Sequence, residues 1–561
     1  MASKLKRMLS VKERRVCRKS SAPSFARPGS PKLRSVADPD YKHSAARRTM
    51  SQPLAMQANL AGPAKLEAVT ALMKKLEDDL KKPTLLPHQR DAALEELKIY
   101  GRDPTNADPI FTPEGIEMLT RHAFVSPSNS TARAALRVLA NTMLLNPQAR
   151  QTFVDLGYED QACRRLKNDS FDDEFLVSRV LFLTTYGTKI DLLALIQKHR
   201  LADIVIENLS KHQKRLGSSQ THVSADPMED MALNETLKLL FNVSHFCPSE
   251  VAAFTGAIPH IVALLWKHDI PSNKPLDPPF NTLVNALLDL KLEDKDVQGA
   301  LYPKSEPAKV ADRFIEILDA ALKAYPDNEL EQLVTPLIGV LRRVHDGAPD
   351  AAKTSIRKKL LPTEQDRKEV LGRGTSLTSR LLRNSTNPLT PHLREAISYL
   401  LFDISDQDAS KFVENVGYGF ASGFLFQKNI PIPASAAEAF STGEEQRPVN
   451  PITGQFIDKE KHVELPEMTE EEKEREAERL YVLFERQDGT CPMTRTHADR
   501  SLGSRRQASL IFRTPWSRRR GQDNFMILEI SEWKSSTIKM KHSIGTGLTC
   551  QRIAYVHQAL A

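Results

Sequence analysis

Residues 234–265 read NETLKLLFNVSHFCPSEVAAFTGAIPHIVALL, and this stretch decides the fold. It holds two apolar runs in which hydrophobic side chains recur at helical spacing. The first stripe contains Leu237, Leu240, Phe241 and Ser244, and the second contains Ile258, Ile261, Val262 and Leu265. Pro248 and Gly256 lie between the runs, where they stop one helix and let the chain reverse into the next. Such a helix-turn-helix unit cannot bury both of its faces alone, so it requires similar neighbours.

The chain supplies such a neighbour at residues 135–157, which read ALRVLANTMLLNPQARQTFVDLG. This segment repeats the first stretch at an offset of 101 residues. The matched positions are Leu136 with Leu237, Arg137 with Lys238, Leu139 with Leu240, Asn141 with Asn242, Pro147 with Pro248, and Phe153 with Phe254. The offset is two or three times the roughly 40–47 residues of a HEAT or armadillo unit. We therefore expect an all-α armadillo/HEAT-type helical solenoid, a superhelix with a long concave wall.

The composition divides the chain into five parts. We expect the solenoid over residues 61–425, preceded by a disordered basic arm at 1–60, and we expect a charged loop inside it at 347–375. Residues 426–467 are rich in Pro, Ala and Glu, which is typical of a linker. Residues 468–486 start with Thr469 and Glu472 as a capping box and predict an isolated amphipathic helix. Residues 487–561 form a basic, irregular tail, so both ends are expected to be disordered.

The net charge of +7 hides an acidic middle. Residues 1–50 carry a surplus of +11 and residues 487–561 a surplus of +7, whereas residues 51–486 carry 52 Lys/Arg and 63 Asp/Glu. A nucleic-acid-binding surface needs a basic stripe that displaces counterions from phosphates, so nucleic acid is not the expected partner. An acidic body suits a partner whose contacting element is basic.

The cysteine spacing and the hydropathy indicate the cellular compartment in which the protein is expected. The five cysteines are scattered, without a Cys-x-x-Cys pair or a His at zinc-ligand spacing, which favours a reduced, cytoplasmic setting and predicts no metal and no cofactor. No apolar run reaches the roughly 18 residues of a membrane span, so no integral membrane segment is expected. The basic, Ser-rich start also has the composition of a transit peptide, which leaves two interpretations of residues 1–60.

The sequence lacks a recognisable catalytic constellation. It contains no phosphate-binding loop, no dinucleotide fingerprint and no H-E-x-x-H motif, so we expect a protein that is not an enzyme. His245 beside Asn242 resembles a catalytic pair, but a His at a helix end more commonly caps the helix or lies on the surface. The acidic run 172–174 is expected to favour the dipole of a helix start. Asn141 and Asn242, inside apolar helices, either bond within the stack or face the groove.

A local motif in the expected linker predicts phosphorylation. Ser441 and Thr442 each precede an acidic residue by three positions, Glu444 and Glu445, which is the pattern that acidophilic kinases read. A phosphate there would add roughly −1.5 to −2 charges and could pair with basic side chains. The alternative is an ordinary acidic linker.

Several runs resemble the synembryn family, also called resistance to inhibitors of cholinesterase. The resemblance is carried by LKIYGRDPTNADPIFTPEGIEML (97–119), LRVLANTMLLNPQARQTFVDLG (136–157), DEFLVSRVLFLTTYGTKIDLL (173–193), ETLKLLFNVSHF (235–246), NPLTPHLREAISYLLFDISDQDASKFVENVGYGFASGFL (387–425), NPITGQ (450–455) and MTEEEKEREAERLYVLFER (468–486). These runs follow the family's order over about residues 60–486, which makes the match specific.

The resemblance implies an armadillo/HEAT solenoid that binds heterotrimeric G-protein α subunits (Gα), as a guanine-nucleotide exchange factor and as a folding chaperone. It implies that the concave wall takes the C-terminal helix of Gα and that the segment after the solenoid embraces the GTPase domain. Lys98 and Arg102 would face the terminal carboxylate of Gα. The other partner-binding positions that it implies are Asn141, Arg179, Phe241, Asn242 and His245. Family members carry activating phosphorylation where this chain has Ser441 and Thr442.

Both ends depart from the family pattern. The first ~55 residues have no recognised counterpart, and the basic tail after Arg486 replaces a continuing helix, which suggests a retained intron or a shifted reading frame. The rival hypothesis is an armadillo adaptor that carries basic peptides without exchange activity. Importin-like adaptors show ladders of groove Trp and Asn, and Trp266 is the only Trp in the expected solenoid. The expected state is a cytoplasmic monomer that is recruited to the plasma membrane through Gα.

Overall fold

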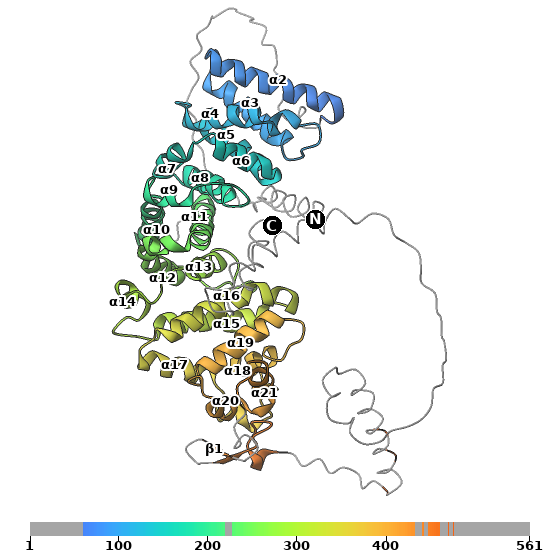
Figure 1. Ribbon diagram of the computed structural model, residues 1–561, viewed down its shortest axis with the longest axis vertical. Helices are drawn as coiled ribbons and strands as arrows, with labels where there is room; N and C mark the ends of the chain where they lie inside the picture. Colours follow the sequence, from blue (N-terminus) through green and yellow to red (C-terminus); the bar gives the residue numbers. More distant parts are fainter. Residues whose placement is uncertain are drawn as a thin grey trace, which may run out of the picture. The chain divides into compact units, whose positions relative to one another are not determined.

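The computed structural model describes residues 60–218, 227–431, 440–442 and 447–460, together with Thr469, Arg475 and Arg479. Helices dominate this part of the chain, and they pack on one another in chain order from α2 (Gly62–Lys81) to α21 (Tyr418–Gln427) (Figure 1). This stack lies in a unit that runs to Gln455, and a second unit begins at Phe456. The expectation of an all-α helical solenoid is confirmed.

One layer of the stack is a continuous series of helices, each packed on the next, which we call the ladder. Its members are α3 (Pro87–Tyr100), α5 (Asn129–Leu145), α8 (Phe171–Thr184), α11 (Pro227–Phe246), α13 (Phe280–Leu287), α16 (Asp327–Asp346) and α19 (Pro391–Asp403). Hydrogen bonds between neighbouring ladder helices connect the start of one helix to the start of the next, and the end of one to the end of the next. In α16 and α19, for example, the His392 backbone N–H donates to Glu331 and the Arg342 side chain donates to Asp403. Neighbouring ladder helices are therefore parallel.

The helices that connect successive ladder members form a second layer. They are α4 (Pro113–Phe124), α6 (Pro147–Asp155), α7 (Glu159–Leu166), α9 (Leu192–Gln197), α10 (Leu201–Ser218), α12 (Ile258–Lys267), α14 (Gln298–Leu301), α15 (Lys309–Ala324), α17 (Asp350–Leu360) and α18 (Leu377–Asn384). Short 3₁₀ segments complete it: η2 (Asp108–Phe111), η3 (Pro248–Ala257), η4 (Lys295–Val297) and η5 (Asp366–Lys368). The core lies between the layers, and α20 (Ala409–Val416) and α21 follow the last ladder helix.

The stretch 234–265 folds as its pattern predicts. It spans the end of α11, the segment η3 that Pro248 opens, and α12. Its repeat forms α5 and α6, with Pro147 at the start of α6. Phe153 and Phe254, which the repeat pairs, are both fully buried. The predicted stripes are buried as well, except that Phe241 stays half-exposed.

Arginines from one helix hold the carbonyl end of another. Arg343 of α16 donates to the Leu287, Leu288 and Leu290 carbonyls at the end of α13, at 3.2, 2.6 and 2.5 Å. Arg313 of α15 does the same for α12 through the Leu265 and His268 carbonyls. The last carbonyls of a helix lack partners within it and carry partial negative charge, so a cation satisfies both needs.

The segment Pro248–Lys267 is long and apolar enough to cross a membrane by length and composition, although the sequence analysis expected no such run. Its apolar side chains Phe254, Ile258, Ile261 and Leu265 are fully buried or nearly so, and the segment packs against α10. A buried helix in a soluble core can have the same length and apolar composition, so these two properties are weak evidence for a membrane span.

Two predicted loops differ from the structure. The expected loop at 347–375 contains the helix α17, whose Ala352, Ile356 and Leu360 are buried at helical spacing within a strongly charged sequence. Charge dominated the sequence pattern there and concealed the narrow apolar stripe.

The expected linker at 426–467 is also only partly correct. Helix α21 continues to Gln427, and strand β1 (Phe440–Thr442) pairs with β2 (Arg447–Val449) as an antiparallel hairpin. Residues 450–455 are hydrogen-bonded to the last helices, so the prediction of a linker is wrong for them. The N-terminal arm, the basic tail and all of the predicted helix 468–486 except three residues lie outside the described part of the chain.

Candidate partner-binding face

The ladder presents a row of half-exposed side chains, which we call the ladder face. On α5 they recur at helical spacing as Arg133, Arg137 and Asn141, because the residues between them pack inward. The face continues through Phe175 and Arg179 of α8 and through Lys238, Phe241 and His245 of α11. Neighbouring helices are parallel, so these stripes lie side by side.

Ion pairs cross the ladder face from helix to helix. Arg137 donates to Asp172 at 2.7 Å, Arg179 lies 3.4 Å from Glu235, and Arg342 donates to Asp403 at 2.7 Å. The charged groups of this face are therefore largely matched within the stack.

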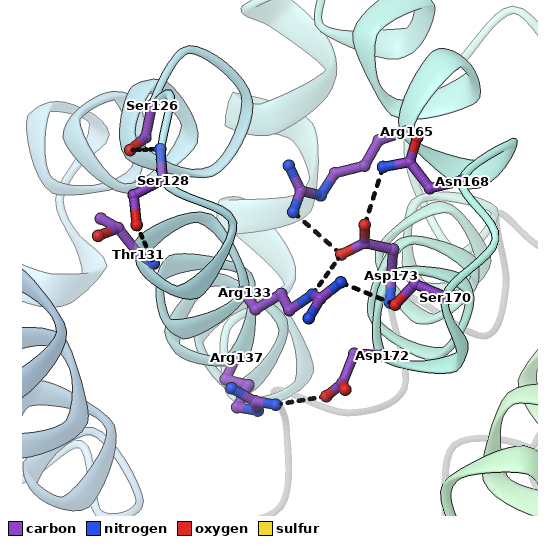
Figure 2. A network of polar contacts seen from close by, with 10 residues as sticks. All are labelled: Ser126, Ser128, Thr131, Arg133, Arg137, Arg165, Asn168, Ser170, Asp172 and Asp173. Atoms are coloured by element: carbon purple, nitrogen blue, oxygen red, sulfur yellow. Dashed lines mark hydrogen bonds and ion pairs between the residues drawn. The ribbon is translucent and has the colours of Figure 1, made fainter. Parts of the chain in front are cut away.

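Three consecutive acidic residues at the start of α8 join it to its neighbours, and Figure 2 shows the contacts of the first two, Asp172 and Asp173. Asp172 pairs with Arg137 at the surface, whereas Asp173 is 1% exposed and accepts from Arg133, Arg165 and Asn168 at 2.8, 3.0 and 2.8 Å. Glu174 is buried and lies 3.0 Å from His212. The acidic run was expected only to favour the helix dipole, and its contacts could not be predicted because Arg133, Arg165 and His212 lie on other helices.

The environment of Asp173 favours its charged form. Burial by itself raises the pKa of this carboxyl, but hydrogen bonds from Arg133 and Asn168 and the charges of Arg165 and Arg133 outweigh it. The net effect is a pKa below the usual value for Asp. A buried carboxylate with this set of donors stabilises the packing of α8 on its neighbours and is not accessible to a partner.

Lys98 and Arg102 lie at the end of α3. Lys98 is half-buried and pairs with Glu95 one turn earlier, whereas Arg102 is exposed just after the helix. A bond from Thr131 to Asp91 at 2.5 Å fixes the register of α3 and α5 near their starts. Arg102 and Asn141 each follow that bond by about three helical turns, so both lie at a similar height on the ladder.

The two repeat-related asparagines have different environments. Asn242 is 2% exposed, and its amide donates to the Thr185 hydroxyl at 2.8 Å, across the seam between α11 and α8. Asn141 is half-exposed, and no residue in the described part of the chain hydrogen-bonds to its side chain. The structure thus places Asn242 inside the stack and leaves Asn141 on the ladder face.

Phe241, His245 and Arg179 lie on the ladder face in mutual contact with their neighbours. The rings of Phe241 and His245 are stacked with centroids 5.8 Å apart, and Nδ1 of His245 lies 3.0 Å from Asp289. The Arg179 guanidinium lies 5.7 Å from the centre of the Phe175 ring. This region combines apolar ring surface with matched charges, which suits an amphipathic helix.

Sequence reasoning missed Lys238, Phe175 and the acidic partners of the face. The repeat already carried a signal for Lys238, because it pairs this residue with Arg137, and the structure places both on the ladder face. Asp289 gave no signal, because only the packing of α13 on α11 brings it to His245.

Ser441 and Thr442 belong to strand β1, whose backbone pairs Ser441 with Pro448 and Thr442 with Arg447. Their side chains lie outside the description. Within the described residues, no three His, Cys, Asp or Glu side chains are grouped so that they could hold a metal ion.

The family model described as guanine nucleotide exchange factor synembryn (Ric8) matches residues 93–496. The chain belongs to the synembryn family. The match begins within α3, covers the ladder from α5 to α19 and extends beyond Arg486, where the sequence was expected to depart from the family.

Curated relatives carry the name chaperone. "Chaperone Ric-8A" of Xenopus tropicalis is 26% identical over 449 residues, which cover 72% of this chain and 82% of that protein. "Chaperone Ric-8A" of Gallus gallus is 25% identical over 468 residues, covering 74% and 83%. "Synembryn-like chaperone C3E7.04c" of Schizosaccharomyces pombe is 27% identical over 345 residues, covering 57% and 62%.

Proposed function

We propose that this member of the synembryn family is a guanine-nucleotide exchange factor and folding chaperone for Gα. The C-terminal helix of Gα would bind along the ladder face, and its terminal carboxylate would meet Lys98 and Arg102. The observation that carries the proposal is the match of the family model over residues 93–496, together with an exposed cation, Arg102, at the height of Asn141, whose side chain has no hydrogen-bond partner among the described residues.

The proposed mechanism requires no acid or base. An exchange factor accelerates GDP release when it binds the nucleotide-free state of Gα more tightly than the GDP-bound state. The same preference stabilises a nascent α subunit before it holds nucleotide, which accounts for a chaperone role. The ladder is suited to this task because its cross-helix ion pairs and arginine caps hold the binding face in one arrangement.

We propose a cytoplasmic monomer that reaches the plasma membrane through Gα, does not bind nucleic acid, and is phosphorylated at Ser441 and Thr442. The second candidate is an armadillo adaptor that carries basic peptides, and it is favoured by the acidic balance of residues 51–486.

GDP release separates the two candidates. Purified full-length protein should accelerate the release of labelled GDP from Gα, and it should raise the yield of folded Gα in a cell-free translation. An adaptor would bind Gα peptides without either effect, so failure in both assays would leave only the second candidate.

Replacing Arg102 by Ala should weaken binding of a Gα C-terminal peptide by about tenfold, because a charge-assisted bond to a carboxylate is lost. Titration calorimetry measures this change directly. Amidation of the peptide's C-terminus should have a similar effect on the original protein and little further effect on the variant. Equal affinity of both proteins for the free-acid peptide would refute the assignment.

Replacing the two asparagines by Ala should separate binding from stability. Asn242→Ala leaves the Thr185 hydroxyl without its donor in a buried seam, so we expect a loss of about 1–3 kcal/mol in the free energy of unfolding. Asn141→Ala breaks no hydrogen bond in the described structure, so we expect unchanged stability and weaker peptide binding. Chemical unfolding and calorimetry on both variants check this, and a reversed pattern would show that the two roles are misassigned.

A further inference from the structure

The segment 450–455, with the sequence NPITGQ, is bound to the end of the stack as a peptide ligand would be. Four consecutive carbonyls, those of Pro451, Ile452, Thr453 and Gly454, each accept a hydrogen bond, two from the start of α21 and two from the segment 367–371 before α18. The donors are the backbone N–H of Tyr418 (2.8 Å), of Gly419 (3.2 Å) and of Leu371 (3.2 Å), and the Arg367 guanidinium (3.1 Å). We infer that 450–455 is an intramolecular ligand, here called the clip, of a peptide-binding site at the start of α21.

Half of the site is the N-terminus of α21. The first N–H groups of a helix have no partner within it, and no side chain caps α21. The carbonyls of Pro451 and Ile452 take this role for Tyr418 and Gly419. A carbonyl is also favoured there by the partial positive charge of the helix start.

The other half is Arg367, which is only 5% exposed. Besides the clip, its guanidinium donates to the carbonyls of Glu414 at 2.9 Å and Asn415 at 3.0 Å, at the end of α20. One buried cation thus joins the clip to the helix before α21. Burial lowers the pKa of Arg367 to about 10, so it still carries its charge near neutral pH.

The clip is preorganised by its own sequence. The Asn450 side chain accepts from the backbone N–H of Ile452 at 2.8 Å, and the Gly454 N–H donates to the Asn450 carbonyl at 2.9 Å. Gly454 has a φ of +67°, and a Cβ there would lie 2.3 Å from Cδ1 of Leu371. Only glycine combines this backbone angle with so close an approach. The Asn450 hydrogen bonds therefore fix the backbone conformation of the clip, and Gly454 allows the clip to approach Leu371 closely. A ligand that is held in its bound conformation in this way loses less entropy on binding.

The hydrogen bonds of the clip also restrain the residues next to it in the sequence. The chain is thereby held on both sides of the segment that contains Ser441 and Thr442: α21 ends before it at Gln427, and the clip begins after it at Asn450. Gln455, the last residue of the clip, is held as well, because its side-chain amide donates to the Lys368 carbonyl at 3.1 Å. This inference does not depend on Gα binding, so a failure of the proposed exchange activity would leave it intact.

Hydrogen exchange on the full-length protein tests the site. Gly454→Ala should release the clip, so the amides of Tyr418 and Gly419 should exchange at least about tenfold faster, while α5, α8 and α11 keep their protection. The matched control is Gly423→Ala, also near the end of the stack, where an added Cβ meets open space. Unchanged protection of Tyr418 and Gly419 in Gly454→Ala would overturn the inference.

A peptide experiment then tests recognition directly. A synthetic peptide of residues 447–456 should bind the Gly454→Ala protein in calorimetry and should bind the original protein at least about tenfold more weakly, because its own clip competes. The same peptide carrying Gly454→Ala should lose binding to the released site, and this comparison requires no further change in the protein. Absence of binding to the released protein, or equal binding of both peptides, would also overturn the inference.

Discussion

Asp173→Asn should lower the free energy of unfolding by about 3 kcal/mol. The substitution keeps the shape of the side chain but removes the charge that Arg133 and Arg165 share inside the stack. Breaking a buried ion pair by neutralising one partner costs about 3–5 kcal/mol, and the lower end applies because Arg133 remains about a quarter exposed. Urea unfolding followed by circular dichroism, with hydrogen exchange in α5, α7 and α8, measures the loss.

Asp172→Asn is the matched control, one residue earlier in the same helix turn. Its pair with Arg137 is about one-third exposed on both sides, so solvent already screens much of the interaction. We expect a change below about 1 kcal/mol. Similar losses in the two variants would show that the burial of Asp173 has no special weight.

The stabilisation by Asp173 should depend on pH in a defined direction. Its pKa in the folded protein is below the unfolded value of about 3.9, so the unfolded state takes up the proton first as the pH falls. The difference in stability between the original protein and Asp173→Asn should be constant above about pH 5 and should shrink below about pH 4. A difference that grows on acidification would contradict the assignment of the charge.

Phe254→Ala should cost about 3–5 kcal/mol, because the ring is fully buried and its loss leaves a cavity at the junction of η3 with α10, α11 and α12. A solenoid contacts itself mainly through neighbouring repeats, so the damage should be local. Hydrogen exchange should accelerate in α10, α11 and α12 and should change little in α19.

Phe426→Ala provides the comparison for a phenylalanine outside the core. Its ring is 80% exposed, so we expect the free energy of unfolding to change by no more than about 0.5 kcal/mol. If Phe254→Ala unfolded the whole stack in one step, the description of the repeats as locally coupled units would be incorrect.

The 101-residue repeat was sufficient to predict the helical solenoid. The repeat paired Leu136 with Leu237 and Phe153 with Phe254, and all four side chains are fully buried, because an amphipathic helix must bury its apolar stripe wherever its neighbours lie. The same reasoning failed for α17 and for residues 450–455, where the stabilising groups are few or come from the backbone.

The contacts of the candidate site were harder to predict from the sequence than the fold. The resemblance implied Arg179, Phe241 and His245 as partner-binding positions, and the repeat paired Arg137 with Lys238, but the partners of these side chains come from neighbouring helices. Asp172, Glu235 and Asp289 meet them only after α8, α11 and α13 have packed in register. A single sequence contains no measure of that register.

The stretch 234–265 therefore determined by itself that this protein is a stack of paired helices, because its hydrophobic pattern is local and its repeat shows that the unit recurs. Only the tertiary structure decided that Asn242 is held inside by Thr185 while its repeat partner Asn141 stays on the ladder face. The physical reason is that a buried Asn requires a hydrogen-bond partner for its amide, which Thr185 supplies to Asn242, whereas a half-exposed Asn such as Asn141 remains in reach of solvent. The packing of the neighbouring helix decides which of the two is buried.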